Sequence, residues 1–146
     1  MDLRATVGIN QLQRVNQRWR RSQEIWQGYN QAFVDLPTSL PADLESATRY
    51  AYQLYTVSVD EARTGISQDG FLVAIVAQNI GVSVYYLSPP ELPHSQRTYD
   101  WKADDCCRAM CVGRQAVSSR LSAKLTSEDV EGVIRAVEMS LASEYK

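Results

Sequence analysis

A stretch without proline, from Leu3 to Leu36, constrains the fold of this chain most. Apolar residues recur along it in steps of three and four, which places them on one face of a helix. A helix of that length is about 45 Å long at 1.5 Å per residue, more than a domain of this size can cover. We therefore expect one long helix that ends before Pro37, with part of its apolar stripe in contact with another chain or domain. The stripe consists of Leu12, Val15, Trp19, Ile25 or Trp26, Tyr29, Phe33 and Leu36.

Several arginines of the same stretch, Arg14, Arg18 and Arg21, fall between the stripe positions and therefore lie on another face. This basic cluster is interpreted either as a solvated face or as a phosphate-binding surface. The whole chain carries 15 basic and 17 acidic side chains, a net charge of -2, so its overall charge favours neither nucleic acid nor an acidic membrane. We expect nucleic acid not to be a partner, with binding through these residues and Arg20 as a minor variant.

The composition, with 45% hydrophobic and 22% charged residues, is that of an ordinary globular protein. A chain of 146 residues is expected to form a single domain, 1–146, with a long helix over 1–36 followed by a sheet and helices over 37–146. Three cysteines within residues 106–111 cannot form a disulfide framework, which favours a reducing compartment. The longest apolar run, 71–77, is far shorter than the roughly 20 residues of a membrane span. We expect a cytoplasmic protein without a membrane segment or signal peptide.

The first half of the remaining chain reads as strand, turn and helix. A loop is expected over 37–46, and the Tyr-, Val- and Thr-rich segment 49–60 is typical of a strand. A polar turn or disordered connection is expected over 60–68. Asp69 then has the position of an N-cap for a short helix that Asn79 and Gly81 would close.

A second strand is expected over 82–87, followed by three prolines that predict an ordered, irregular loop up to about residue 101. A helix over 104–116 and a short extended segment over 117–122 complete the middle of the chain. Thr126 to Asp129 resembles a capping box, and Val130, Val133, Ile134, Val137 and Leu141 have helical spacing. Together these elements predict an α+β fold.

The side chains that could carry chemistry are few. The single histidine, His94, lies in the proline-rich segment beside Ser95, and adjacent residues rarely form a nucleophile and base pair. Cys107 and Cys111 would share a helical face, but a zinc site needs further ligands that the sequence does not supply. We therefore expect a structural or surface histidine, packing thiols, no metal and no catalytic residue.

Four segments, in order and spacing, resemble the C-terminal small domain of DegT/DnrJ/StrS-type sugar aminotransferases, pyridoxal-phosphate (PLP) enzymes of the aspartate aminotransferase fold. The resemblance implies a long N-terminal helix and a small, mostly antiparallel sheet of two to three strands covered by helices. It also implies PLP as the cofactor of the family, and a homodimer or a complementary large-domain chain as the partner. The segments are MDLRATVGINQL (1–12), YAYQLY (50–55), IGVSVYY (80–86) and LTSEDV (125–130).

The resemblance also places the cofactor chemistry outside this chain. In the family, the Schiff-base lysine, the aspartate on the pyridine nitrogen and the phosphate-binding residues precede the matching segment. The three lysines present, Lys102, Lys124 and Lys146, lie in a polar run, before a helix cap and at the last position. An amine must be desolvated and fixed against the cofactor to serve as this nucleophile. We expect no cofactor-binding residue and no PLP bound by this chain alone.

Three functional hypotheses follow. The first is a truncated or stand-alone small domain without transaminase activity. The second is half of a split sugar aminotransferase completed by another chain, and the third is a helix-mediated oligomerisation or interaction module. Tyr85 and Tyr86 are the candidates to face the substrate: strand alternation would send them to opposite faces, so one of the two should look toward the substrate cleft. The alternative is that both are core aromatics with one hydroxyl reaching water. Tyr85 also stands where the family often has histidine.

Overall fold

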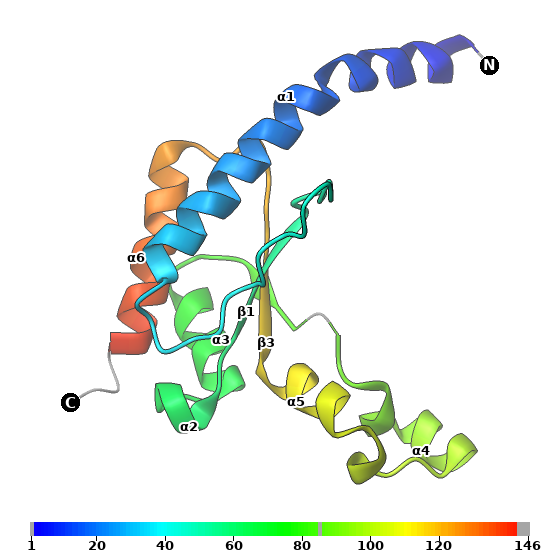
Figure 1. Ribbon diagram of the computed structural model, residues 1–146, viewed down its shortest axis with the longest axis vertical. Helices are drawn as coiled ribbons and strands as arrows, with labels where there is room; N and C mark the ends of the chain where they lie inside the picture. Colours follow the sequence, from blue (N-terminus) through cyan, green and yellow to red (C-terminus); the bar gives the residue numbers. More distant parts are fainter. Residues whose placement is uncertain (1, 85, 143–146) are drawn as a thin grey trace.

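The computed structural model describes residues 2–84 and 86–142. Helices and three short strands alternate along this part of the chain, which confirms the expected α+β class (Figure 1). The order is α1 (Asp2–Phe33), β1 (Leu54–Ser58), α2 (Glu61–Thr64), α3 (Gln68–Ala77), β2 (Val82–Ser83), η1 (Pro89–Glu91), α4 (Pro93–Tyr99), η2 (Ala103–Cys106), α5 (Cys107–Gln115), β3 (Ala116–Arg120) and α6 (Ser127–Ala142).

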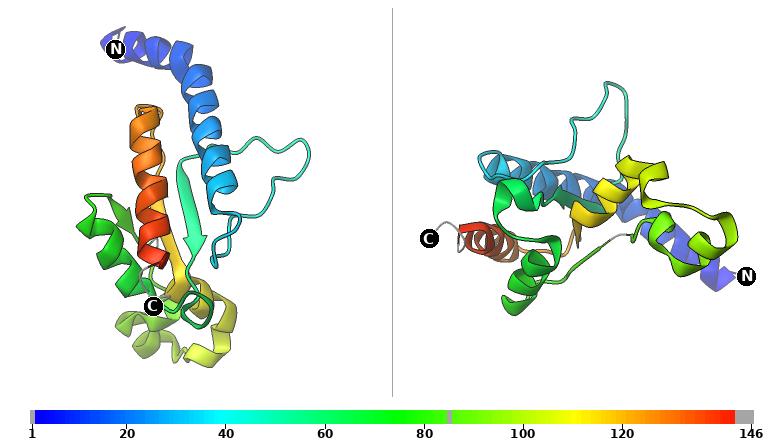
Figure 2. Two further views of the ribbon diagram at one scale, coloured as in Figure 1. Left: turned by 90° about the vertical axis from the view of Figure 1, so that its left-hand side faces the viewer. Right: turned by 90° about the horizontal axis from the view of Figure 1, so that it is seen from below.

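The sheet is antiparallel, with strand order β1-β3-β2. In the pairing of β1 with β3, Leu54 lies opposite Arg120 and Ser58 opposite Ala116. The central strand, β3, thus comes from the last third of the chain. Helices α1, α3 and α6 pack together over one face of the sheet (Figure 2). Helices α4 and α5 lie beyond the opposite end of the sheet from the N-terminus of α1 (Figures 1 and 2).

An aromatic cluster joins α1 to the sheet. The ring of Tyr55 on β1 contacts Trp26, Tyr29 and Phe33 of α1, with centroids 6.0, 5.2 and 5.9 Å apart. The hydroxyl of Tyr55 donates a hydrogen bond of 2.8 Å to Asn30 Oδ1. Burial raises the pKa of Tyr29 to about 12 and also raises the pKa of Tyr55, so both phenols stay protonated in any ordinary buffer.

Only the C-terminal half of α1 is covered. Its buried side chains begin at Ser22, whereas Leu12 is 74% and Val15 is 52% exposed. The N-terminal turns extend beyond the rest of the molecule (Figure 1). The expected helix is therefore confirmed, with its end at Phe33 rather than Leu36, and this chain leaves the first part of the stripe uncovered.

The first strand is shorter than the sequence predicts. The expectation for 49–60 is wrong at residues 59–60, which follow the end of the strand, and at residues 49–53, because Tyr52 has a φ of 50° and turns the backbone out of the strand. The ring of Tyr52 instead packs against Trp19 and Trp26 of α1, and Trp19 Nε1 donates a hydrogen bond of 2.7 Å to Tyr50 O. Aromatic packing on the long helix therefore overrides local strand propensity here.

The connection 60–68 contains a helical turn, α2, where the sequence predicted a polar turn. Asp60 caps it by accepting a hydrogen bond from Ala62 N–H, and Gly65 ends it with a φ of 75°. Ser67, rather than Asp69, is the N-cap of α3: its hydroxyl accepts from Gly70 N–H at 3.1 Å. Asp69 lies in the first turn of that helix, where a carboxylate is favourable toward the helix dipole.

The proline-rich segment is helical rather than irregular. Strand β2 ends at Ser83, four residues before the end expected from the sequence. Pro89 and Pro93 begin η1 and α4, respectively, where a missing N–H costs no hydrogen bond and the fixed φ suits a helix. The helix expected over 104–116 is divided into η2 and α5, and the extended segment expected over 117–122 is β3.

The capping box of α6 is confirmed. Thr126 Oγ1 accepts from Asp129 N–H at 3.1 Å, and the Asp129 carboxylate accepts from the Thr126 N–H at 2.8 Å and hydroxyl at 2.7 Å. The two hydrogen bonds that the carboxylate accepts, mainly the one from the Thr126 backbone and then the one from its hydroxyl, lower the pKa of Asp129.

The capping box predicts a pH dependence of stability. Because the pKa of Asp129 is lower in the folded chain than in the unfolded chain, its contribution is complete above the unfolded pKa, near 3.9, and is lost as the pH falls through the folded pKa. The free-energy difference between the wild type and Asp129→Asn, from urea unfolding, should therefore shrink as the pH falls from neutral into this acid range. Glu128→Gln, in the same helical turn, is the matched control. An Asp129→Asn difference that stays constant with pH would contradict this assignment.

The aromatic cluster predicts a graded response at Tyr55. Tyr55→Phe keeps the ring contacts and removes the hydrogen bond to Asn30, and should cost about 1 kcal/mol of unfolding free energy. Tyr55→Ala also leaves a cavity beneath α1 and should cost about 3–5 kcal/mol. Urea unfolding monitored by tryptophan fluorescence measures both. Tyr50→Phe is the control at a partly exposed tyrosine, and equal effects of the two Tyr55 variants would contradict the role of the ring.

Candidate functional site

The segment that follows β2 forms one wall of a groove. Tyr85 lies outside the described residues, and Tyr86 is 71% exposed. Because β2 ends at Ser83, strand alternation does not determine where Tyr86 points. Its exposure excludes the alternative of a core aromatic for Tyr86.

This segment is fixed to α5 by close packing. The Ser88 hydroxyl donates a hydrogen bond of 2.5 Å to Ala109 O. A Cβ on Gly113 would stand 2.1 Å from Ser88 Oγ, so the approach of the two elements requires glycine at that position. An ion pair of 2.9 Å between Arg114 Nε and Glu91 Oε1 adds a second connection between α5 and η1.

The resulting groove has a volume of about 660 Å³ and mostly apolar walls. Arg108 supplies a cation and Tyr86 a phenol, so the groove can bind and orient a polar or anionic group. No periodic pattern in the sequence singles out Arg108. It lies beside Tyr86 only because α5 packs against a loop that is more than twenty residues earlier in the chain. The groove is lined by Tyr86, Leu87, Ser88, Pro89, Leu92, Arg108, Ala109, Val112 and Gly113.

The other sequence candidates do not come together with this groove. His94 is exposed on α4, whereas the neighbouring Ser95 is buried, and neither lines the groove. Cys107 and Cys111 are exposed on α5. Among the side chains that the structure describes, no group of three His, Cys, Asp or Glu is arranged to hold a metal ion.

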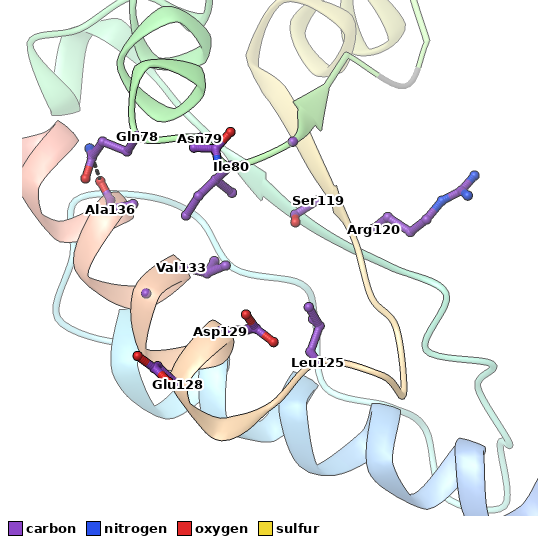
Figure 3. Close-up of a pocket in the computed structure, with 12 residues that line it drawn as sticks. Gln78, Asn79, Ile80, Ser119, Arg120, Leu125, Glu128, Asp129, Val133 and Ala136 are labelled. Atoms are coloured by element: carbon purple, nitrogen blue, oxygen red, sulfur yellow. Dashed lines mark hydrogen bonds between the residues drawn. The ribbon is translucent and has the colours of Figure 1, made fainter.

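A second pocket, of about 420 Å³, lies between the C-terminal end of α3, β3 and the first turns of α6 (Figure 3). Two of its polar side chains, those of Gln78 and Asp129, already hold the fold together. Gln78 Nε2 donates to Ala136 O at 3.2 Å and to Ser140 Oγ at 3.2 Å, and the Asp129 carboxylate belongs to the capping box. Ile80, Val133 and Leu125 supply apolar lining. The hydrogen bonds of Gln78 thereby connect the C-terminal end of α3 to α6.

Neither of the two lysines that the structure describes is placed to form a covalent bond with a carbonyl cofactor. Lys102 and Lys124 are both exposed, whereas such a lysine has to be desolvated and held in place. Lys146 lies outside the described residues. Lys124 instead joins Arg14, Arg18, Arg20 and Arg21 around a third hollow. No helix in the part of the chain described is long and apolar enough to cross a membrane.

Comparison with known proteins gives a consistent family. The model of the DegT/DnrJ/EryC1/StrS aminotransferase family matches residues 1–138. The spore coat polysaccharide biosynthesis protein SpsC of Bacillus subtilis is 31% identical over 137 residues, which are 93% of this chain and 35% of that protein. The protein MJ1066 of Methanocaldococcus jannaschii is 29% identical over 136 residues, again 35% of its length. The chain thus spans about a third of the relatives it matches.

Solved structures show the same fold. The aminotransferase TlmJ from Streptoalloteichus hindustanus superimposes with a TM-score of 0.77 at 21% identity, covering 95% of this chain and 36% of that one. Spr1654 from Streptococcus pneumoniae, in its PLP form, gives 0.82 at 19% identity, covering 100% and 37%. Helicobacter pylori PseC, an aminotransferase involved in the biosynthesis of pseudoaminic acid, gives 0.80 at 18% identity, covering 93% and 36%. Since the family model matches nearly the whole sequence, the chain belongs to the DegT/DnrJ/EryC1/StrS aminotransferase family.

Proposed function

We propose that these 146 residues act as the small domain of a PLP-dependent nucleotide-sugar aminotransferase and do not transaminate by themselves. The observation that carries this proposal is the partial coverage: the chain matches about 35% of SpsC and of MJ1066. The exposure of Lys102 and Lys124 supports it, because neither amine is placed to form a Schiff base. On this proposal, residues 1–146 are one domain, in which the long helix α1 (Asp2–Phe33) is followed by the sheet and the remaining helices.

The Tyr86 groove does not fit the coenzyme. Pyridoxal phosphate needs a buried amine, a carboxylate on the pyridine nitrogen and a phosphate site in one cleft. The Tyr86 groove offers one cation, Arg108, and its lining contains neither a carboxylate nor a lysine. The coenzyme groups would therefore come from a further part of the enzyme.

Within this proposal, Tyr85 and Tyr86 are the substrate-facing candidates. For Tyr86, the support is its exposure beside Arg108 in a groove of about 660 Å³, which is within the usual size of a small-molecule site. A phenol and a guanidinium can hydrogen-bond the hydroxyl and phosphate groups of a nucleotide sugar. The tight contact of Ser88 with Gly113 would keep this wall in a fixed position.

The absence of transamination is tested with the coenzyme itself. The purified chain is incubated with PLP, reduced with borohydride and examined by intact mass spectrometry, in parallel with glutamate as amino donor. We expect no stoichiometric lysine adduct and no turnover, because the described lysines are exposed. Spr1654, whose structure exists in a PLP form, is the positive control. One equivalent of adduct at Lys102 or Lys124 together with turnover would contradict the proposal.

A second candidate function rests on α1. Leu12 and Val15 are exposed on the helix, and Leu3 and Val7 are exposed further toward its N-terminus. We propose that another chain covers this face, either a second copy in a homodimer or a chain that carries the large domain of a split aminotransferase. A helix-mediated interaction module without enzymatic activity uses the same surface. The cytoplasm remains the proposed compartment, and the cysteines, which form no disulfide in the described chain, are compatible with it.

Sedimentation velocity tests the homodimer. The wild type should sediment as a dimer at high concentration, and Leu12→Glu should weaken the association about tenfold or more, because it places a charge in the apolar contact. Val73→Glu, at an equally exposed position of α3, is the matched control and should leave the dimer intact. A wild type that stays monomeric at every concentration would contradict self-association and leave the large-domain chain as the partner.

A further inference from the structure

A basic groove lies between α1 and the loop that precedes α6. It has a volume of about 800 Å³, and its lining combines one face of the long helix with a segment more than a hundred residues away. Helices α1 and α6 run beside each other, which brings that loop to the middle of α1 (Figure 2). The groove is lined by Arg14, Asn16, Gln17, Arg18, Arg20, Arg21, Glu24, Ala123 and Lys124.

The charges of this groove are not balanced. Residues 3–33 contain five arginines and a single carboxylate, Glu24, although the whole chain is acidic on balance. Glu24 is paired with Arg21 at 3.4 Å. In the described part of the chain, no carboxylate lies within 4 Å of the side-chain nitrogens of the other four groove cations. Arg14 and Arg18 are one helical turn apart, where like charges repel, so an anion bound between them would relieve that repulsion.

Two of the arginines are held in place by neighbouring groups. Arg21 Nη2 donates to Leu125 O at 3.0 Å, which links the helix to the opposite wall of the groove. Arg18 Nη1 donates to Gln11 Oε1 at 2.7 Å. Each guanidinium has five N–H donors, so both keep donors for a ligand while losing much of their rotational freedom. The loss of side-chain entropy on binding would therefore be smaller than for a cluster of freely mobile arginines.

The geometry selects the kind of anion. Arginine forks match the oxygens of phosphate, and Arg14, Arg18 and Arg21 span about 10 Å along the helix, more than one phosphate occupies. The lining contains no aromatic side chain on which the bases of a single-stranded nucleic acid could stack, and the volume is that of a small-molecule site. Asn16 and Gln17 add amide groups that can bind hydroxyls.

We propose that the basic groove binds a small molecule that carries a chain of two or more phosphates. The phosphates would lie along Arg14, Arg18 and Arg21, with Lys124 contributing from the facing loop. The α4 and α5 end of the molecule, where the Tyr86 groove lies, is remote from this loop (Figure 1). The binding proposed here therefore does not depend on the coenzyme chemistry or on the aminotransferase role.

Isothermal titration calorimetry at low ionic strength tests the groove with inorganic tripolyphosphate as the probe. Both probe and protein are used in the same buffer, with orthophosphate and sulfate compared at equal ionic strength. Tripolyphosphate should bind at least about tenfold more tightly than either single anion, because several arginines act together. ADP is the second arm: tighter binding of ADP than of inorganic diphosphate identifies a nucleoside-bearing ligand, and equal binding identifies the phosphate chain alone. Either result supports the proposal.

The variants separate the groove from overall charge. Arg14→Ala with Arg18→Ala should weaken tripolyphosphate binding about tenfold or more, and alanine, the best helix former, keeps α1 helical. Arg4→Ala with Arg135→Ala removes the same charge from exposed positions outside the groove and should change binding less than about twofold. Lys124→Ala, in a loop, gives a third readout that does not involve the helix. Circular dichroism checks the fold of each variant.

Three results would overturn the proposal. The first is equal binding of sulfate and tripolyphosphate by the wild type. The second is an equal loss of binding in the two double variants, which would show a response to net charge only. The third is a single-stranded oligonucleotide or an acidic peptide that binds this groove more tightly than tripolyphosphate, which would assign the surface to a macromolecule.

Discussion

The contact between the second half of α1 and the sheet determines much of this structure. Tyr55 of β1 stands against Trp26, Tyr29 and Phe33, and its hydroxyl is satisfied by Asn30 of the same helix. A sheet of three short strands offers little surface of its own, and these large rings supply it with an apolar cover. Helices α3 and α6 then pack on the same face. The long helix therefore serves as the frame on which the other elements are assembled.

The same helix is left half-covered by this arrangement. Its apolar stripe continues toward the N-terminus through Val15 and Leu12, which are exposed, while the arginines between them gather on another face. One helix thus has two surfaces with different chemistry, one apolar and one cationic. The relatives SpsC and MJ1066 are about three times as long as the segment that this chain matches, and it is the apolar surface that we propose another chain to cover.

Some polar side chains of this chain stabilise the fold, and others lie on surfaces that could bind a ligand. The capping carboxylate of Asp129 and the amide of Gln78 are occupied in holding α6. Tyr86 and Arg108, by contrast, lie on the surface of a groove whose shape is fixed by the contact of Ser88 with Gly113. The Tyr86 groove and the basic groove both have the features of binding surfaces.

The sequence by itself determined the features that depend on local spacing. The apolar period predicted α1, the pattern Thr126 to Asp129 predicted the cap of α6, and four short segments indicated the family. Only the tertiary structure decided where strand β1 begins, because Tyr52 turns away from the strand to pack on α1. It likewise decided that Pro89 and Pro93 start helices rather than a loop. It also brought Lys124 to the arginines and Arg108 to Tyr86. Such pairs are set by packing between distant segments, which no local pattern records.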